Sequence, residues 1–475
     1  MKRLNGTDAL FLSLETPSWH QHVGGLTILE TEGSRFSFEA LVERIEERLD
    51  FAPKFRWKLR EVPGNLDRPV WVDDPNFDVR QHVRRVAVPS PGGAKETAEL
   101  AGTLLGIQLD RRRPLWELWL LEGLAGGRVA LLMKYHHCLL DGIAGASLAT
   151  ALLDLEPDPP PRTPPEADTS AGPDPSDLEL LAGAARRMVG SPRRNLRFAM
   201  SLARRGVTIV DRMVRQPANR QLLQAPVTPF NGTVGPRRSL AFSSVALADV
   251  HALKQCHQVK VNDVILALVA GALRSYLLGL GQLPDAPLVS AVPVSTRAEG
   301  NTAQDNQVSS MLVSLATHLD DPVARLREIY DSSQSSKEML QAVRARQIQS
   351  IGEVAAPVLI SSVIRAAYST NLMTRMPLRV NTLVSNVPGP PVPIYASGAR
   401  VLGIYPCSII LEGMGVNTTV LSYCDRVDFG VHVDPDLVPD PWAIADAVPD
   451  ALRELMKESN LGDPTPVEDP FGGTR

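Results

Sequence analysis

The chain has 475 residues, of which 44% are hydrophobic and 21% are charged, and its formal net charge at pH 7 is −4. This length exceeds a single ordinary hydrophobic core and predicts two domains or one large duplicated unit. The slightly acidic balance provides no overall attraction to nucleic acid, so we exclude that class of partner.

Cysteine usage and hydropathy indicate where the protein resides. The chain has four isolated and widely spaced cysteines, Cys138, Cys256, Cys407 and Cys424. This spacing predicts no disulfide framework and indicates a reducing compartment. The longest apolar run, residues 264–273, is too short to span a membrane. Asp8 interrupts the start of the chain before a signal-peptide core can form. We therefore expect a protein that is soluble or peripheral to a membrane.

The N-terminal part of the chain shows helix and strand patterns. A short amphipathic helix is predicted near residues 4–15, with Thr7 or Asp8 as its N-cap. Residues 23–30 are strand-like, and residues 38–49 have apolar side chains at helical spacing. Pro114, Leu115 and Trp116 then open a strand that ends near residue 121. We interpret Trp116 as an aromatic anchor of the core.

Two histidines and an aspartate are predicted to lie on a short turn after a buried strand. The apolar residues 129–133 are followed by His136, His137, three residues, Asp141 and Gly142, and residues 143–155 have a helix-like composition. Three interpretations stay open: ordinary histidines, a metal site, and general base catalysis by an imidazole. We expect no metal, because adjacent histidines rarely point the same way. Gly142 would allow a tight turn, and Asp141 would orient it.

Two segments of unusual composition follow. Residues 154–177 are acidic and crowded with proline, which predicts a linker. Residues 184–220 contain ten arginines against the single acid Asp211, with apolar residues between them. A basic amphipathic helix of this kind suits an anionic membrane surface. A crossover helix with its charged side in water is the alternative interpretation.

The second half repeats the mixture of strands and helices. Residues 238–245 read as a strand, and Asn262 or Asp263 is the expected N-cap of a long helix over residues 263–276. A strand at residues 288–293 leads into Pro293-Val294-Ser295-Thr296-Arg297. Further strands are predicted at 381–391, 402–411, 415–423 and 427–433, and helices at 250–256, 321–342, 354–368 and 440–457. The tail after Gly462 is expected to be disordered.

His136-His137-x-x-x-Asp141-Gly142 resembles the signature of the CoA-dependent acyltransferase superfamily. That superfamily includes chloramphenicol acetyltransferase and the condensation domains of peptide synthetases. More narrowly, the chain is similar to bacterial wax ester synthases/acyl-CoA:diacylglycerol acyltransferases from about residue 4 to residue 457. The similarity is carried by Asp8, Glu15-Thr16-Pro17, Trp71 to Pro75, Pro114-Leu115-Trp116, Asn262-Asp263, Pro293 to Arg297 and Ser385 to Pro390. Asp305 stands where family members usually have Gly, so the resemblance does not define the shape of the turn there.

The resemblance implies an α/β (α+β) fold of two chloramphenicol-acetyltransferase-like domains, each of mixed sheet and helices, joined by a crossover linker. The N-terminal half, residues 1–153, would carry the histidine motif. Residues 154–235 would form the acidic linker and the basic crossover segment. Residues 236–457 would form the C-terminal half, and residues 458–475 a disordered tail.

The resemblance also implies roles for individual residues. His137 would be the general base and His136 would support the loop, while Asp141 would pair with Arg297 from the other half. Ser295 or a backbone N–H would stabilise the oxyanion. The residues implied for the substrate channel are Pro114, Leu115, Trp116, Asn262, Asp263 and Ser295. Acyl-CoA would be the co-substrate, with no bound cofactor.

The implied reaction transfers a fatty acyl group from acyl-CoA directly to the hydroxyl of diacylglycerol or of a long-chain alcohol. A condensation-type enzyme that uses a carrier-protein-bound acyl donor is one alternative, and a non-catalytic lipid-binding relative is another. We expect the protein to be cytoplasmic and peripherally associated with the inner face of the membrane or with lipid inclusions. The sequence does not predict its oligomeric state.

Overall fold

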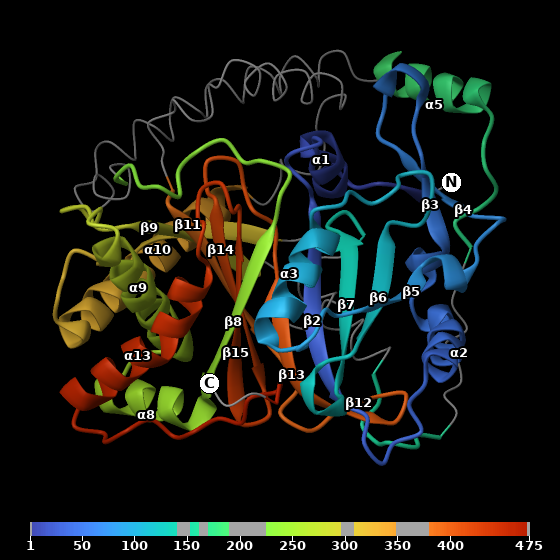
Figure 1. Cartoon of the computed structure of the whole chain (residues 1–475). Helices are drawn as coiled ribbons and strands as arrows, with labels where there is room; N and C mark the ends of the chain where they lie inside the picture. Colours follow the sequence, from blue (N-terminus) through green and yellow to red (C-terminus); the bar gives the residue numbers. More distant parts are fainter. Residues whose placement is uncertain are drawn as a thin grey trace.

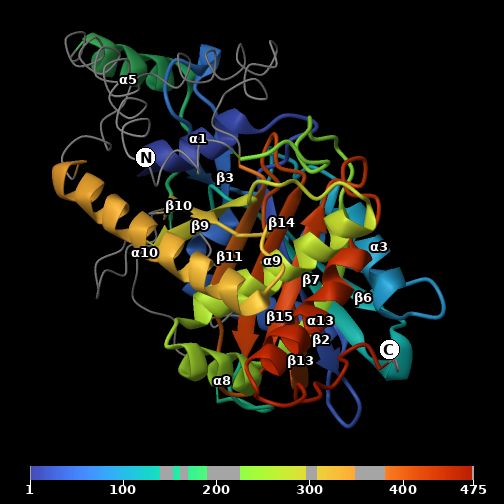
Figure 2. The same ribbon diagram turned by 90° about the vertical axis from the view of Figure 1, so that its left-hand side faces the viewer.

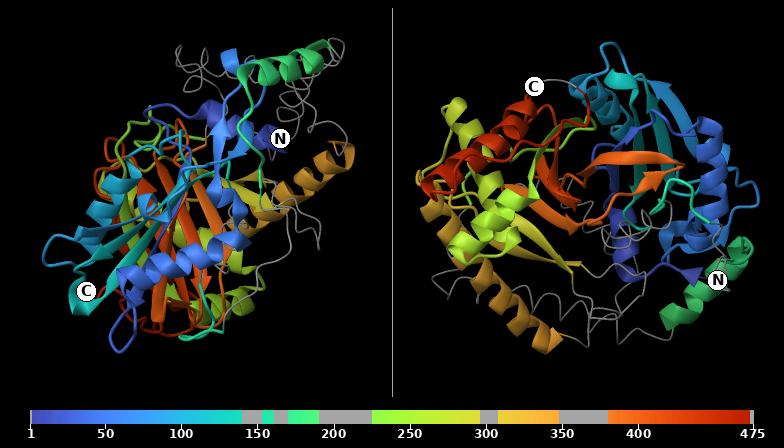
Figure 3. Two further views of the ribbon diagram at one scale, coloured as in Figure 1. Left: turned by 90° about the vertical axis from the view of Figure 1, so that its right-hand side faces the viewer. Right: turned by 90° about the horizontal axis from the view of Figure 1, so that it is seen from below.

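The computed structural model describes residues 2–139, 153–160, 170–189, 225–295, 308–347 and 380–472. Two six-stranded sheets stand side by side, and helices cover their outer faces (Figure 1). Seen from below, the strands lie toward the middle of the molecule and the helices toward its outside (Figure 3). This mixed arrangement confirms the fold class that the sequence predicts.

The first sheet has the strand order β12-β13-β2-β7-β6-β5, in which only the β5–β6 pair is parallel. Its strands are β2 (His22–Glu30), β5 (Val83–Ala87), β6 (Trp116–Glu122), β7 (Val129–His136), β12 (Tyr395–Ala396) and β13 (Ala399–Cys407). The helices around it are α1 (Gly6–Leu14), α2 (Phe38–Arg48) and α3 (Ala94–Leu105). Side chains alternate across β2, so that Leu26 and Ile28 pack toward α3 whereas Leu29 joins the core on the other face.

A small sheet with the order β1-β4-β3 projects beyond the first one. It consists of β1 (Lys2–Arg3), β3 (Trp57–Arg60) and β4 (Val70–Asp73), and α5 (Asp177–Val189) packs on it. Val62, Val70, Val72, Leu180 and Ala184 form a separate hydrophobic cluster there. The described part of the basic segment, up to residue 189, therefore begins on a helix that is docked onto the protein.

The second sheet has the order β10-β9-β11-β14-β15-β8. Its strands are β8 (Ser239–Ala246), β9 (Val289–Ser295), β10 (Val308–Ser314), β11 (Thr382–Pro388), β14 (Val416–Tyr423) and β15 (Arg426–Val433). Helices α8 (Leu247–His257), α9 (Val261–Gly279), α10 (Pro322–Gln347) and α13 (Trp442–Glu458) lie over its outer face (Figure 2). All eight residues of β15 are buried, because both faces of this strand are covered.

The long helix α9 forms the centre of the second core. Its length and composition would allow it to cross a membrane, but 72% of the apolar stretch is buried inside the protein. Val264, Leu266 and Leu268 have no exposed surface and pack in the core shared with α13 and the second sheet. Burial within the fold is sufficient to explain the apolar composition of this helix.

Strands from late in the sequence complete the first sheet. β13 pairs with β2 over residues 400–407, and β12 extends that edge. β13 also packs against β15 of the second sheet, where a Cβ atom added to Gly430 would lie 1.9 Å from the carbonyl oxygen of Pro406. In the same contact, the Ile404 N–H donates to Asp428 Oδ2 at 2.8 Å. β13 thereby joins the two halves of the molecule.

Two predicted helix caps are wrong by a few residues. The N-cap of α1 is Asn5, whose side chain accepts a hydrogen bond from the Asp8 N–H at 2.7 Å. The N-cap of α9 is Lys260. Asp263 is three residues further along the helix, and its Oδ2 accepts a hydrogen bond from the Lys260 N–H at 3.0 Å. In both cases the sequence contains the right polar residues, but the chain enters the helix earlier than the apolar pattern indicates.

The expectation of a disordered tail is wrong for the residues that the structure describes, which extend to Gly472. Phe471 is buried and stacks on Phe242 and Tyr405, with ring centroids 5.6 Å apart in both contacts. Thr465 also donates from its hydroxyl to Asp249 at 2.8 Å. A buried aromatic ring and hydrogen bonds to the body of the protein therefore hold a tail whose composition is otherwise polar and rich in proline.

Candidate active site

His136 is the last residue of β7, so the strand is longer than the sequence predicts and only His137 lies on the turn. The backbone N–H of His136 donates to the Leu115 carbonyl at 3.0 Å, which continues the contact between β6 and β7. The imidazole is fully buried. Its Nδ1 accepts a hydrogen bond from the Cys138 N–H at 3.1 Å, and its Nε2 lies 3.7 Å from Glu15 Oε2. This arrangement requires the proton of a neutral ring to sit on Nε2.

Glu15, which follows α1 directly, is the carboxylate that faces His136. Only 3% of its side chain is exposed. Its Oε2 accepts from Arg111 Nε at 3.0 Å and from Arg111 Nη2 at 2.8 Å, and its Oε1 accepts from the Gln21 N–H at 3.3 Å. Burial alone would raise the pKa of Glu15, but the contacts with His136 and Arg111 lower this pKa to about 2. The carboxylate is therefore ionised throughout the physiological range.

Burial also determines the protonation state of His136. Removal from water lowers the pKa of its imidazole, and the neighbouring carboxylate of Glu15 only partly opposes that effect. At neutral pH His136 is therefore neutral, with both ring nitrogens directed at protein groups. This geometry suits a side chain that supports the loop, and it leaves no nitrogen directed at a substrate.

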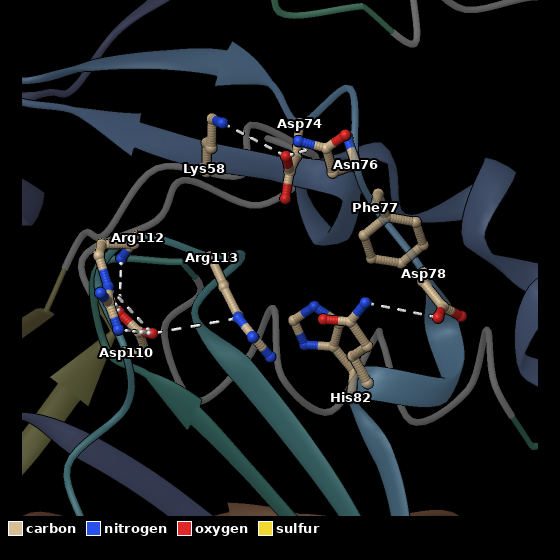
Figure 4. A pocket seen from close by; sticks show the side chains of 10 residues that line it. Lys58, Asp74, Asn76, Phe77, Asp78, His82, Asp110, Arg112 and Arg113 are labelled. Carbon is tan, nitrogen blue, oxygen red and sulfur yellow. Dashed lines mark hydrogen bonds and ion pairs between the residues drawn. The ribbon is translucent and has the colours of Figure 1, made fainter.

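Arg111 belongs to a turn that has a polar cavity on its other side. Asp110 accepts from the Arg112 N–H at 3.0 Å and pairs with the Arg112 side chain at 2.9 Å, which fixes the turn. The cavity, about 310 Å³ in volume, is lined by three basic and three acidic side chains among its ten residues (Figure 4). Lys58, for example, lies 3.3 Å from Asp74. Because the charges balance, the cavity carries no net attraction for an anion, and we interpret it as the outer wall of this turn.

His137 has a different environment from its neighbour. Its backbone N–H donates to the Gln21 carbonyl at 2.8 Å, so the backbone of the turn is fixed. The ring of Phe11, from α1, stacks on the imidazole with centroids 4.1 Å apart and an interplanar angle of 15°. The side chain is only partly buried. Of the two histidines, His137 is thus the one that is held in place yet accessible.

The segment that faces His137 is also bound to the second half of the molecule. The Trp19 indole Nε1 donates to the Ile410 carbonyl at 2.8 Å, and Arg238 Nη2 donates to the Ser18 carbonyl at 2.9 Å. These contacts hold the chain just before β2 between the two halves. The histidine motif therefore lies close to the junction of the halves, as the resemblance implies.

Several residues implied for a channel are instead packed in the core. Leu115 has no exposed surface and Trp116 is 2% exposed. The Trp116 Nε1 donates to the Phe55 carbonyl at 2.8 Å, and its ring stacks on His82. Pro114, beside them, is also buried. These residues position β6 and, through the Leu115 carbonyl, the backbone of His136.

The structure describes some of the other predicted site residues fully, one by its backbone alone, and three not at all. Asp263 is fully buried and accepts a hydrogen bond from the Lys260 N–H at the start of α9, whereas Asn262 is partly exposed. For Ser295, the last residue of β9, the structure describes the backbone only. Asp141, Gly142 and Arg297 lie outside the described residues, so the proposed Asp141–Arg297 pair stays a prediction. In the parts of the chain that are described, His, Cys, Asp and Glu side chains form no group of three that could hold a metal ion.

Sequence reasoning did not identify the roles of Glu15, Arg111 and Gln21. Glu15 appeared only as part of a family pattern, and Arg111 is 96 residues away from it in the sequence. A carboxylate directly after a short amphipathic helix was the one local signal. Its partners are determined by the pairing of β2 with β7, in which His22 lies opposite His136.

Comparisons with known proteins agree with this architecture. The model of the wax ester synthase/diacylglycerol acyltransferase catalytic domain matches residues 4–265, and the model of the C-terminal domain of the same family matches residues 304–456. The chain is 37% identical over 468 residues to a putative diacylglycerol O-acyltransferase of Mycobacterium tuberculosis, covering 97% of this chain and 91% of the relative. It is 36% identical over 440 residues to the probable diacylglycerol O-acyltransferase tgs2 of the same species, covering 89% and 92%.

Solved structures show the same fold. The wax ester synthase/diacylglycerol acyltransferase from Marinobacter aquaeolei VT8 is 28% identical, with a TM-score of 0.70 and coverage of 97% of this chain and 100% of that one. The first condensation domain of the calcium-dependent antibiotic synthetase has a TM-score of 0.59 at 12% identity, covering 98% and 97%, which indicates a shared fold. The chain therefore belongs to the wax ester synthase/diacylglycerol acyltransferase family, and it is an acyltransferase.

Proposed function

We propose that the protein transfers a fatty acyl group from acyl-CoA to the hydroxyl of diacylglycerol, of a long-chain alcohol, or of both, with His137 as the general base. The proposal is supported by the contrast between the two histidines. His136 is buried and has both ring nitrogens directed at protein groups, whereas His137 is fixed by its backbone and by Phe11 but remains accessible. An accessible imidazole in a defined position is what a general base requires.

The chemistry is a direct transfer between two bound substrates. His137 takes the proton of the acceptor hydroxyl as the oxygen attacks the thioester carbonyl carbon. The carbon–sulfur bond then breaks, and the imidazolium returns the proton to the departing CoA thiolate, so that the base is regenerated. Holding both substrates together removes much of the entropic barrier. The reaction consumes acyl-CoA and the alcohol and releases CoA and an ester.

The environment of Cys138 supports a route without an acyl-enzyme intermediate. This thiol follows His137 directly, but it is fully buried. Burial raises the pKa of the Cys138 thiol well above its usual range. Because the thiolate is the nucleophilic form, Cys138 is unsuited to attack a thioester. We therefore assign it a packing role beside the catalytic turn.

One product assay tests the reaction. Labelled palmitoyl-CoA is offered to the purified protein with hexadecanol, with dioleoylglycerol, or with neither, and the labelled esters are separated and counted. Ester formation from free acyl-CoA supports the proposal and excludes a requirement for a carrier-bound donor. Varying both substrates should give intersecting double-reciprocal lines, as expected for a ternary complex. Absence of ester with both acceptors would contradict the proposed function.

We also propose that the protein associates peripherally with the inner face of the membrane or with lipid inclusions, where its acyl acceptors are found. On α5, whose last residues begin the basic segment, Leu180 and Ala184 face the protein, while Leu178 is 80% exposed and Arg187 pairs with Asp67. Replacing the arginines at 193, 194, 204 and 205 by Gln should reduce flotation with anionic liposomes, most strongly at low salt. Unchanged flotation would leave this segment as a crossover only.

A further inference from the structure

The side chain of Gln21 is a buried amide with neither of its polar atoms paired. It has no exposed surface, and its Nε2 and Oε1 have no hydrogen-bond partner in the part of the chain that the structure describes. Its backbone, in contrast, is fully engaged with the site, because its N–H donates to Glu15 and its carbonyl accepts from the His137 N–H. Unpaired buried amides are costly and rare in folded proteins, so a group of this kind calls for a ligand or a water molecule.

The strand pairing shows where this amide points. A Cβ atom added to Gly24 would lie 2.9 Å from the Leu105 side chain of α3, and Lys134 Nζ donates to the Leu104 carbonyl at 3.0 Å. Even-numbered residues at this end of β2 and β7 therefore face α3. Gln21 and His137 directly adjoin these strand ends, and one further step of the alternation assigns both to the opposite side, where the Phe11 ring of α1 stacks on His137.

Gln21 and His137 are also direct neighbours across the two strands. His22 lies opposite His136 in the register, and the hydrogen bond from His137 N–H to the Gln21 carbonyl extends the pairing by one residue. Directly opposed residues on one face of an antiparallel pair have Cβ atoms about 4.5–5.5 Å apart. An acceptor bound with its hydroxyl at His137 would consequently have its neighbouring polar groups beside this amide.

We infer that Gln21 determines acceptor specificity, by donating a hydrogen bond from its amide to an ester carbonyl of diacylglycerol. The inference rests on the proposed function, because it needs an acceptor hydroxyl at His137. A long-chain alcohol has a single polar group, the hydroxyl that reacts, and offers nothing to the amide. Diacylglycerol has ester carbonyls beside its hydroxyl, and one of them can accept a hydrogen bond from the Nε2 group that is unpaired in the free protein.

Substituting the amide by apolar groups of similar size tests the inference. Gln21→Met and Gln21→Leu should lower kcat/KM for dioleoylglycerol by about 10- to 100-fold, the usual effect of leaving a hydrogen bond unmade at a buried site. The value for hexadecanol with the same palmitoyl-CoA should stay within about 2-fold of the wild-type value, since no amide contact is lost. Gln255→Met, at an exposed position on α8, is the matched control and should change neither value.

The thermal stability of Gln21→Met and the activity of the wild-type protein with each acceptor distinguish failure of the role of Gln21 from failure of the proposed function. Thermal unfolding of Gln21→Met without ligand should occur at the wild-type temperature or above it, because the substitution removes an unpaired buried amide. Equal losses of kcat/KM with both acceptors would place the amide at the acyl donor and overturn the inference. Unchanged kcat/KM with both acceptors would also overturn it. If the wild-type protein acylates neither acceptor, the proposed function itself fails. If it acylates both and the ratio does not move, only the role of Gln21 fails.

Discussion

Glu15 and His136 form a buried pair in which carboxylate Oε2 lies 3.7 Å from imidazole Nε2. Arg111 holds the same oxygen with two hydrogen bonds, and the Cys138 N–H holds the other ring nitrogen. The pair joins the end of α1 to the end of β7, immediately before the turn that carries His137. We interpret Glu15 as a positioning residue that acts through His136 on the catalytic turn.

Glu15→Gln should therefore destabilise the protein and lower turnover without a large change in KM. The substitution removes the buried carboxylate that Arg111 and His136 share, which should cost about 2 kcal/mol of unfolding free energy at pH 7. Urea unfolding and steady-state kinetics measure the two effects. Glu61, which is exposed and lies 3.7 Å from the same Arg111, provides the control. Glu61→Gln should leave both quantities nearly unchanged.

The pH dependence of stability follows from the same carboxylate. Because the pKa of Glu15 in the folded protein is lowered to about 2, ionised Glu15 stabilises the fold above its ordinary pKa of 4.5. That contribution is lost as the pH falls from about 4.5 toward 2. The difference in unfolding free energy between wild type and Glu15→Gln should therefore be constant from pH 6 to 8 and decrease below pH 4.5. A difference that does not change with pH in the acid range would contradict this account.

The sequence predicted the elements around this pair better than the pair itself. Residues 23–30 and 38–49 have periodic apolar patterns, and strands and helices lie there with shifts of one residue at the ends. The role of Trp116 as a core anchor was also predictable, because a large aromatic side chain next to a strand has few other places to lie. The pairing of Glu15 with His136 was not, since it depends on how segments about 120 residues apart are brought together by the sheet.

The origin of β13 was equally hidden from the sequence. Its alternating pattern indicates a strand, but local propensity does not reveal which sheet a strand joins. Here the strand leaves the second half and pairs with β2, and Tyr405 reaches from it to the Ser244 hydroxyl of β8 at 3.1 Å. Long-range pairing of this kind is determined by packing between the halves, which a single sequence does not display.

Gly430→Ala should disrupt the contact between β13 and β15. A methyl group at this position would lie 1.9 Å from the Pro406 carbonyl oxygen. The backbone would have to move to relieve this clash. We expect a loss of about 2–4 kcal/mol of unfolding free energy, measured by urea denaturation. Gly25→Ala is the control, because a methyl group there meets nothing within 4 Å. Equal stability of the two variants would mean that the strands do not approach so closely.

Phe471→Ala should show that the C-terminal tail is part of the core. The ring is 1% exposed and contacts Phe242 and Tyr405. Removing a buried phenylalanine ring typically costs about 3–5 kcal/mol, and the tail should then become accessible to proteases. Limited proteolysis followed by mass spectrometry would locate the new cleavage sites. Val392→Ala, at a side chain that is 46% exposed, should have little effect on either measurement.

A double-mutant cycle tests the pair that the resemblance implies between Asp141 and Arg297. Asp141→Asn and Arg297→Met should each lower activity or soluble yield, because each leaves a charge without its partner. The double variant should lose much less than the sum of the single losses. Additive losses in activity and in unfolding free energy would mean that the two side chains do not interact.

His137→Ala tests the general base directly. Turnover should fall by about 10²–10⁴-fold, the usual contribution of a positioned acid–base group. Binding of acyl-CoA should change little, because the imidazole acts on a proton during the reaction. Circular dichroism and thermal unfolding would establish that the variant is folded. Near-normal turnover by a folded His137→Ala protein would exclude the mechanism.

His136→Ala and removal of metal ions distinguish this mechanism from its alternatives. His136→Ala should cost less turnover than His137→Ala, because His136 only supports the turn, and it should lower stability as well, since its buried contacts with Glu15 and Cys138 are lost. Dialysis against a metal chelator should leave activity unchanged. If His136→Ala instead caused the larger loss with unaltered stability, the roles of the two histidines would have to be exchanged.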